Sequence, residues 1–440
     1  MCSPQLKGFP AECKPASPSR CTRSERGLDP QGTSGTRRTQ ERLVSGAMNQ
    51  ALQHALRLAL LCLALASSGF VLQLLSFALP GLVRDWDLRS TDFAAAFTVH
   101  LLGVTLGALA FGRLGDRHGR RSMLLLSLVV QALASLAGLF VHSPTAMAVT
   151  RLFAGLGVGG MTPNAVALAI ELAPARWRTA ATTMVLSGVA LGSSLPALVV
   201  RGLVPTHGWP VLFVIAGFAS LAIAGLTRVA VPESSVFHES GRASEGGLRR
   251  LFAPDLLRST ACLWVMYAGA MLSMHLVTSW LPLLLEQAGL GAARAAALTG
   301  VVHLAGAGAT ISTAVLLTRW GKRWLVALLW IALGSAGLLA LEGFATNHVT
   351  LVIAALGFGL VGSQGALGTL AAHLYPPDCR PTGVGAAIAV GRAGSMLGPL
   401  AGGALQAAGL PAQGLFTLPL VSLGAALVAA AFFRPQTGGS

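Results

Sequence analysis

The sequence predicts an all-α integral membrane protein, and three observations lead to that class. Of the 440 residues, 53% are apolar and only 11% are charged, and the mean hydropathy is +0.67, which is more apolar than an ordinary soluble domain. Crossing the hydrocarbon takes roughly 20 apolar residues per helix, and such stretches follow one another almost to the C-terminus, separated by short basic turns. The stretches are continuous rather than alternating, which excludes a barrel of short strands.

Hydropathy places about twelve transmembrane helices along the chain. The expected spans are 55–80, 93–112, 122–141, 145–170, 180–203, 209–230, 259–285, 294–317, 324–344, 349–372, 382–406 and 412–433. Arginine and lysine gather in alternate turns, which predicts a multi-pass protein of the bacterial inner membrane with both termini cytoplasmic. These turns face anionic lipid and account for the net charge of +15, so no nucleic-acid partner is expected.

The first fifty residues differ from the rest of the chain. Residues 1–50 are rich in Pro, Gly, Ser and Arg without apolar periodicity, so we expect a disordered basic tail. They lack the apolar core of a signal peptide, and Met48 is an alternative start of translation. The six cysteines show no metal-ligand spacing, so neither a disulfide nor a metal site is expected, and no cofactor is implied.

An internal repeat divides the membrane part into two halves. The turn "GRLGDRHGRR" at 112–121 is similar to "LTRWGKR" at 317–323, and an offset of 202 residues sets Gly119 on Gly321. In a second pair of turns, the same offset aligns a proline with a proline and an arginine with an arginine. Two turns that share one offset indicate a duplicated six-helix unit, which is typical of transporters with a central site.

The repeat fixes the expected domain boundaries. We expect a six-helix bundle over residues 51–230, a cytoplasmic connector over 231–258 and a second six-helix bundle over 259–434.

Two arginines inside predicted spans, Arg151 and Arg392, are the strongest indication of cargo. An arginine at mid-span costs roughly 3 kcal/mol on insertion scales and is usually functional. A single intramembrane arginine would be explained as an anchor that bonds backbone carbonyls. Two such arginines, one from each half and in spans poor in acids, favour an anion site. Guanidinium grips carboxylate bidentately, so an organic acid is expected. Gly155 and Gly159 form a small-residue face that should pack closely against a neighbouring helix.

Other polar or aromatic groups within the spans are candidates to line the same site. They are Gln73, Thr162, Asn164, His275, Ser279, Trp280 and Gln364. Each could hydrogen-bond a ring hydroxyl or stack on a ring, but each would serve equally as an interhelical contact. His100, His275 and His303 are the intramembrane candidates for carrying a proton, because histidine titrates near neutral pH.

The turn at 112–121 is the candidate gate. Its proposed gating residues are Gly112, Asp116, Arg117, Gly119, Arg120 and Arg121. Asp116 is expected to accept from Arg117 or Arg120 across the interface of the halves, in contacts that form in one access state only; alternatively, the arginines merely fix topology. The second copy has Thr318 in place of Asp116, so the gate is asymmetric. Glu171 is expected to pair with arginines of the turn that follows it.

These motifs resemble a known family. "GRLGDRHGRR" and "RLFAGLGVGG" at 151–160 are similar to signatures of the major facilitator superfamily. With "TGVGAAIAVGRAGSMLGPLAGG" at 382–403 they resemble aromatic acid:proton symporters, most of all bacterial 3-(3-hydroxyphenyl)propionate transporters. The resemblance implies the major facilitator fold, with twelve helices in two pseudo-symmetric bundles. It also implies proton-linked import of a hydroxyphenylpropionate or hydroxybenzoate by alternating access.

The first helix departs from the family at two positions. Where the symporters carry acids tied to proton coupling, this chain has Ser68 and Val71, neither of which titrates near neutral pH. Three explanations remain open: a histidine, with His275 preferred, has taken over the proton; the protein is an uncoupled facilitator; or it is an impaired relative.

Other functional classes are less favoured by the sequence. A non-transporting sensor is consistent with the lost acids. A drug or metabolite exporter is consistent with the fold, but the spans of this chain lack the buried acid that would bind a cationic drug. No nucleophile–base pair, metal cluster or phosphate loop appears, so no enzyme is expected. The expected carrier is a monomer in the lipid bilayer whose partners are a small organic anion and, if transport is coupled, protons.

Overall fold

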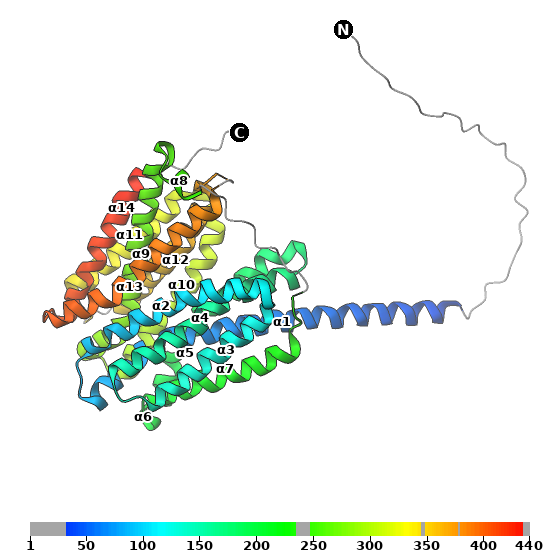
Figure 1. Ribbon diagram of the computed structural model, residues 1–440, viewed down its shortest axis with the longest axis horizontal. Helices are drawn as coiled ribbons and strands as arrows, with labels where there is room; N and C mark the ends of the chain where they lie inside the picture. Colours follow the sequence, from blue (N-terminus) through cyan, green and yellow to red (C-terminus); the bar gives the residue numbers. More distant parts are fainter. Residues whose placement is uncertain (1–31, 235–246, 345–347, 377–378, 434–440) are drawn as a thin grey trace, which may run out of the picture. The chain divides into compact units, whose positions relative to one another are not determined.

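The computed structural model describes residues 32–234, 247–344, 348–376 and 379–433. The chain divides into two units, Met1–Leu52 and Gln53–Ser440, and the fold below is that of the second. Its helices, shown in Figure 1, are α1 (Gly32–Trp86), α2 (Ala94–His118), α3 (Arg120–Ala137), α4 (Pro144–Leu172), α5 (Arg178–Gly202), α6 (Val204–His207), α7 (Pro210–Ala230), α8 (Gly247–Leu251), α9 (Pro254–Gln287), α10 (Ala292–Trp320), α11 (Lys322–Glu342), α12 (Val349–Leu374), α13 (Arg380–Ala407) and α14 (Thr417–Phe432).

Twelve of the described helical segments are long and apolar enough to cross a membrane, which confirms the predicted all-α membrane class. The first of them covers Leu52–Trp86, close to the expected start. Helix α1 itself begins earlier, at Gly32, within the stretch for which we expected disorder. Residues 32–51 hold three Arg, two Gln, two Ala, one Glu and one Leu, which are strong helix formers. Residues 1–31 of the expected tail lie outside the described part of the chain.

Helix pairing repeats between the two halves. Helices α2 and α4, and α3 and α7, pack together in the first half, as α10 and α12, and α11 and α14, do in the second, and Figure 1 shows the two groups of helices. The duplicated turns match as well, because Gly119 (φ +99°) and Gly321 (φ +54°) both take a left-handed backbone conformation that side chains disfavour. The predicted duplication is confirmed in the helix packing.

Glycines bring α2 and α4 into close contact. A Cβ on Gly155 or Gly159 of α4 would run into the carbonyl oxygen of His100 or Val104 on α2, and Gly107 of α2 is equally close to α4. Such small-residue faces let backbones of membrane helices approach each other. The predicted packing face at Gly155 and Gly159 is confirmed.

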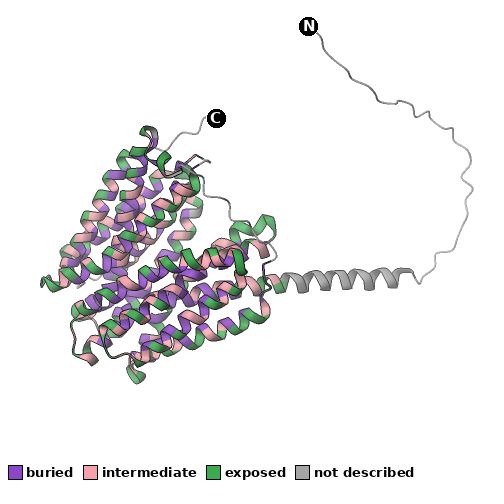
Figure 2. Cartoon of the chain, viewed as in Figure 1, coloured by how far each residue is buried: buried purple, intermediate pink, exposed green. Residues whose placement is uncertain are grey.

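The outward faces of the helices are apolar. Figure 2 shows exposed residues along the outer sides of the helices, and many of them are large hydrophobic side chains, among them Phe140, Leu198, Phe218, Val229 and Leu351. Exposed apolar surface of this extent is rare on soluble monomers. It is the surface expected of helices that face hydrocarbon.

Candidate functional site

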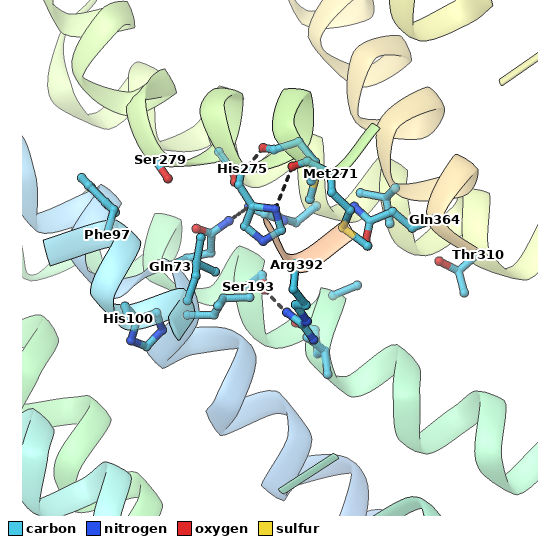
Figure 3. Close-up of a pocket in the computed structure, with 18 of the residues that line it drawn as sticks. Gln73, Phe97, His100, Ser193, Met271, His275, Ser279, Thr310, Gln364 and Arg392 are labelled. Atoms are coloured by element: carbon cyan, nitrogen blue, oxygen red, sulfur yellow. Dashed lines mark hydrogen bonds between the residues drawn. The ribbon is translucent and has the colours of Figure 1, made fainter. Parts of the chain in front are cut away.

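A cavity of about 290 Å³ lies between the two halves. Figure 3 shows its polar lining, in which Gln73 and His100 come from the first half and His275 and Arg392 from the second. An adjoining recess, which shares His275 and Arg392, is also lined by Thr162. Ser279, Gln364 and His303 complete the predicted residues that meet there. The two halves therefore converge on one site, as the repeat predicts.

Arg392 supplies the permanent positive charge of this cavity. It lies on α13, which packs closely on α9 because Gly394 and Gly398 let the two backbones approach each other. A Cβ on the preceding Gly391 would meet the ring of Tyr267. Arg392 is partly buried, and none of the three ion pairs found among the described residues includes it. Its guanidinium is free to bind an anion.

Three histidines line the cavity, and hydrogen bonds to backbone carbonyls orient two of them. Nδ1–H of His100 donates to the carbonyl oxygen of Arg151 at 2.9 Å, and Nδ1–H of His275 donates to that of Met271 at 3.0 Å. A carbonyl can only accept, so in the neutral form of each ring Nε2 carries the lone pair. His303 bonds the side-chain amide of Gln73 across the halves. The cavity thus offers imidazole nitrogens that can accept a hydrogen bond or a proton.

The structure does not bring Arg151 to the cavity. Its side chain is buried, with the guanidinium carbon 5.1 Å from the centre of the Phe213 ring. Its three guanidinium nitrogens have no hydrogen-bond partner among the described residues. The side chain of Arg151 packs toward α7, which carries Phe213. Arg151 contacts the cavity lining only through its backbone carbonyl oxygen, which accepts the hydrogen bond from His100.

Asn164 and Trp280 also lie outside the cavity lining. The amide of Asn164 donates to the carbonyl oxygens of Phe111 at 3.1 Å and Gly160 at 2.8 Å, which ties α2 to α4. Nε1–H of Trp280 donates to the carbonyl oxygen of Pro399 at 3.2 Å. Both therefore follow the interhelical alternative left open by the sequence.

Several lining residues had not been singled out from the sequence. Phe97, Ser193, Met271 and Thr310 all face the cavity. Phe97 lies three residues before His100, on the same helical face, and its ring packs 5.6 Å from that of Trp280. That spacing is the signal that could have identified it. Met271 and Ser193 carry no comparable signal, because most residues around them are also small or apolar.

Contacts between the halves seal one side of the cavity. The Ser76 hydroxyl donates to the carbonyl oxygens of Thr278 and Ser279 at 2.6 and 2.9 Å, and Thr98 donates to that of Met396 at 3.2 Å. The Ser90–Gln406 hydrogen bond and the Arg84–Glu286 ion pair follow farther out. All of these lie beyond Gln73, toward the face that carries the turn between α1 and α2. This side of the cavity is closed.

The cavity continues toward the other face. We call this the basic-loop face, defined by the turns between α2 and α3, α4 and α5, α10 and α11, and α12 and α13. A second cavity of about 430 Å³ shares Leu186 and Thr310 with the first and is lined by Thr318, Gly321 and His373 near that face. The path from Arg392 therefore leads to the basic-loop face.

The candidate gate forms its ion pairs within the first half rather than across the interface. Arg120 pairs with Asp116 at 2.8 Å and with Glu171 of α4 at 3.4 Å. Glu171 thus pairs with the α2–α3 turn and not with the turn that follows it. Arg117 is exposed, and Arg121 contributes through its backbone N–H, which donates to Glu233. In this state the turn is braced on α4.

Glu233, which the sequence analysis missed, caps this turn. Its carboxylate accepts from the backbone N–H of Arg121 at 2.8 Å and from the backbone and hydroxyl of Ser122 at 3.2 and 2.7 Å, at the N-terminus of α3, where carboxylates are stabilising. A Cβ on Gly119 would lie 2.7 Å from the carboxyl carbon. Partial burial alone would raise the pKa of Glu233, but the hydrogen bonds from Ser122, Arg121 and Ser234 hold it below its ordinary value.

We predict that Glu233→Ala loosens the α2–α3 turn, with faster backbone hydrogen exchange measured by mass spectrometry. Because the pKa of Glu233 is lowered, its contribution is present at neutral pH and is lost as pH falls through the lowered pKa. The exchange rate of the turn in the wild type should therefore approach that of the variant only at acidic pH. The exposed Glu342 supplies the control Glu342→Ala, and equal exchange in all three proteins at neutral pH would contradict the cap.

Comparison with known proteins agrees with this geometry. The family model described as Major Facilitator Superfamily matches residues 61–399. A gallate transporter of Pseudomonas putida is 31% identical (80% of this chain, 85% of that one), and a 3-(3-hydroxy-phenyl)propionate transporter of Escherichia coli is 32% identical (79% and 86%). The crystal structure of a D-xylose-proton symporter superposes with a TM-score of 0.70 at 17% identity (87% and 98%). The chain is a transporter of the major facilitator superfamily whose curated relatives carry aromatic acids.

Proposed function

We propose that this protein imports an aromatic carboxylic acid, of the hydroxyphenylpropionate or hydroxybenzoate type, by alternating access. The observation that carries the proposal is the guanidinium of Arg392 in the cavity between the halves, with no ion-pair partner among the described residues. A guanidinium offers two parallel donors to a carboxylate, and the cargo brings the negative charge that the cavity lacks. Relatives named for gallate and hydroxyphenylpropionate support this class.

The lining suggests how the cargo is held. The carboxylate binds Arg392, and the ring lies among Phe97, Leu101 and Met271, where aromatic contacts are favourable. Nε2 of His100 is buried without a hydrogen-bond partner and can accept from a ring hydroxyl. The buried amide nitrogen of Gln364, also without a partner, can donate to it. An anionic end, a flat apolar body and a hydroxyl are the three features this cavity recognises.

The closed and open sides support an alternating-access cycle. We propose that the basic-loop face is cytoplasmic, as the positive-inside rule implies, so the described conformation opens inward from the inner membrane. Cargo entry from outside then requires the Ser76 and Thr98 bonds between the halves to break. Closure of the inner side moves the turn that Arg120 braces on Glu171. We propose that one monomer performs this cycle with both termini inside.

Proton linkage is assigned to His275. It lines the cavity and its recess together with Arg392, and its Nδ1–H is held by Met271, which leaves Nε2 to bind the proton. A protonated imidazole beside the cargo carboxylate favours binding of both, because opposite charges stabilise each other. We predict that His275→Gln lowers accumulation to the equilibrium level while downhill entry continues at a reduced rate. The exposed His142 gives the control His142→Gln, which should accumulate normally.

The test of the function is uptake of radiolabelled 3-(3-hydroxyphenyl)propionate by proteoliposomes, with and without an inward proton gradient. Accumulation above equilibrium only with the gradient is the expected result. Equilibration alone would identify an uncoupled facilitator, which the loss of acids at Ser68 and Val71 favours, and binding without flux would identify a sensor. Competition by a cationic dye, and none by benzoates or phenylpropionates, would point to an exporter and contradict the proposal.

A further inference from the structure

The described lining of the cavity holds a fixed positive charge and no fixed negative one. Arg392 is accompanied by three histidines, but neither the cavity nor its recess is lined by a described Asp or Glu. The sequence agrees, because the acids of the spans stand near their ends. These are Asp85, Asp92, Asp116, Glu171, Glu286 and Glu342. Among the described residues that line the cavity and its recess, no carboxylate can pair with the guanidinium.

Alternating access makes this imbalance costly. To change sides, the carrier must close the path toward the basic-loop face, which Leu186 and Thr310 now line, before the contacts of Ser76 and Thr98 on the other side open. In between, Arg392 is shielded from bulk water on both sides. A buried ion without a partner is strongly unfavourable, whereas one held in a good ion pair is tolerated. When His275 is neutral, the loaded carrier therefore passes through closure more readily than the empty one.

None of the described side chains that line the cavity or its recess can replace the cargo as counter-ion. Ser68 lines the same recess as Arg392, but it is neutral, and its hydroxyl donates to the carbonyl oxygen of Leu65 at 2.7 Å. Val71 is apolar. The histidines are neutral without a proton and positive with one, so they add no negative charge in either form.

We propose that the carboxylate of the cargo is the counter-ion that lets this carrier change sides, so that it exchanges one aromatic carboxylate for another much faster than it returns empty. This rests on the proposed function and adds a second mode to it. Net import proceeds at the slow rate of the empty return, while release of one organic anion into a medium that contains another is fast. The protein is then an importer whose faster mode is the exchange of aromatic carboxylates.

The test compares two kinds of release from the same proteoliposomes. Vesicles loaded with radiolabelled 3-(3-hydroxyphenyl)propionate are diluted into buffer with or without excess unlabelled compound, at mildly alkaline pH, and leakage is subtracted with protein-free vesicles. We expect release into the cargo-containing buffer to be at least about tenfold faster, which corresponds to about 1.4 kcal/mol in barrier height. Equal rates of saturable release would overturn the exchange proposal and leave the proposed function standing. Absence of saturable release in both buffers would overturn the proposed function.

A charge placed in the recess provides the second arm. Ser68→Asp puts a carboxylate where it can pair with Arg392 in the empty carrier, and Ser68→Asn is the matched neutral control. Both rates are measured at saturating cargo in variants that remain monodisperse. We expect the ratio of the two release rates to fall at least several-fold in Ser68→Asp and to stay at its wild-type value in Ser68→Asn. The same ratio in both variants would contradict the counter-ion role of the cargo.

Discussion

Arg392→Gln is expected to abolish saturable uptake of aromatic carboxylates. Removing one partner of a buried charge pair leaves the other desolvated and unpaired, which costs roughly 3–5 kcal/mol, so binding should weaken by a factor on the order of 100 or more. The described lining offers the carboxylate no second permanent cation, because Arg151 packs on Phe213 outside it. Binding is measured by displacement of radiolabelled 3-(3-hydroxyphenyl)propionate from detergent-solubilised protein, and uptake in vesicles.

Two further variants make the Arg392 experiment specific. Arg392→Lys keeps the charge but loses the planar fork, so it should retain part of the binding. Arg151→Met removes a guanidinium that is equally costly to insert into the membrane but lies outside the cavity. It should leave the cargo affinity within a few-fold of the wild type. If Arg151→Met abolished binding while Arg392→Gln did not, the binding site would have to be moved to the first half.

The difference between these two arginines marks the limit of what the sequence predicts. Insertion cost identifies both as intramembrane charges, and that reasoning is independent of where each side chain points. The direction depends on the rotation of the helix, which an amphipathic pattern would reveal. The helices that carry Arg151 and Arg392 have apolar or small residues around most of their circumference. Only the contact with Phe213 shows that the side chain of Arg151 packs against α7.

The fold was more accessible, because its signals are local or repeated. Apolar length alone gives the spans, and the offset between Gly119 and Gly321 gives the two halves before any contact is known. Glu233 could not be found in the same way. It acts through the N-terminus of α3, more than a hundred residues earlier in the chain, and no periodicity connects a connector residue to a turn that far away. For the same reason, the sequence identifies Glu171 and Arg120 as charged residues but does not predict that they form an ion pair.

Gly159→Leu is expected to have the largest effect on folding. A Cβ at this position would overlap the carbonyl oxygen of Val104, which belongs to the backbone of α2 and cannot rotate away. Overpacking commonly costs about 1–3 kcal/mol, and here relief requires α2 and α4 to separate along their whole interface, so we expect most of the protein to be lost as aggregate. The measurement is monodisperse yield and thermal unfolding by fluorescence-detected size-exclusion chromatography.

The control for this substitution is already present in the chain. Gly225 of α7 is exposed, and a Cβ there would meet no atom within 4 Å. Gly225→Leu adds the same side chain to a surface that faces hydrocarbon, where leucine is favourable, and it removes a glycine from a helix. Its yield and melting temperature should therefore equal or exceed those of the wild type. A folded, transport-competent Gly159→Leu would mean that α2 and α4 are not held at this distance. The position of His100 in the cavity would then also be wrong, because Gly155 packs on the carbonyl oxygen of that histidine.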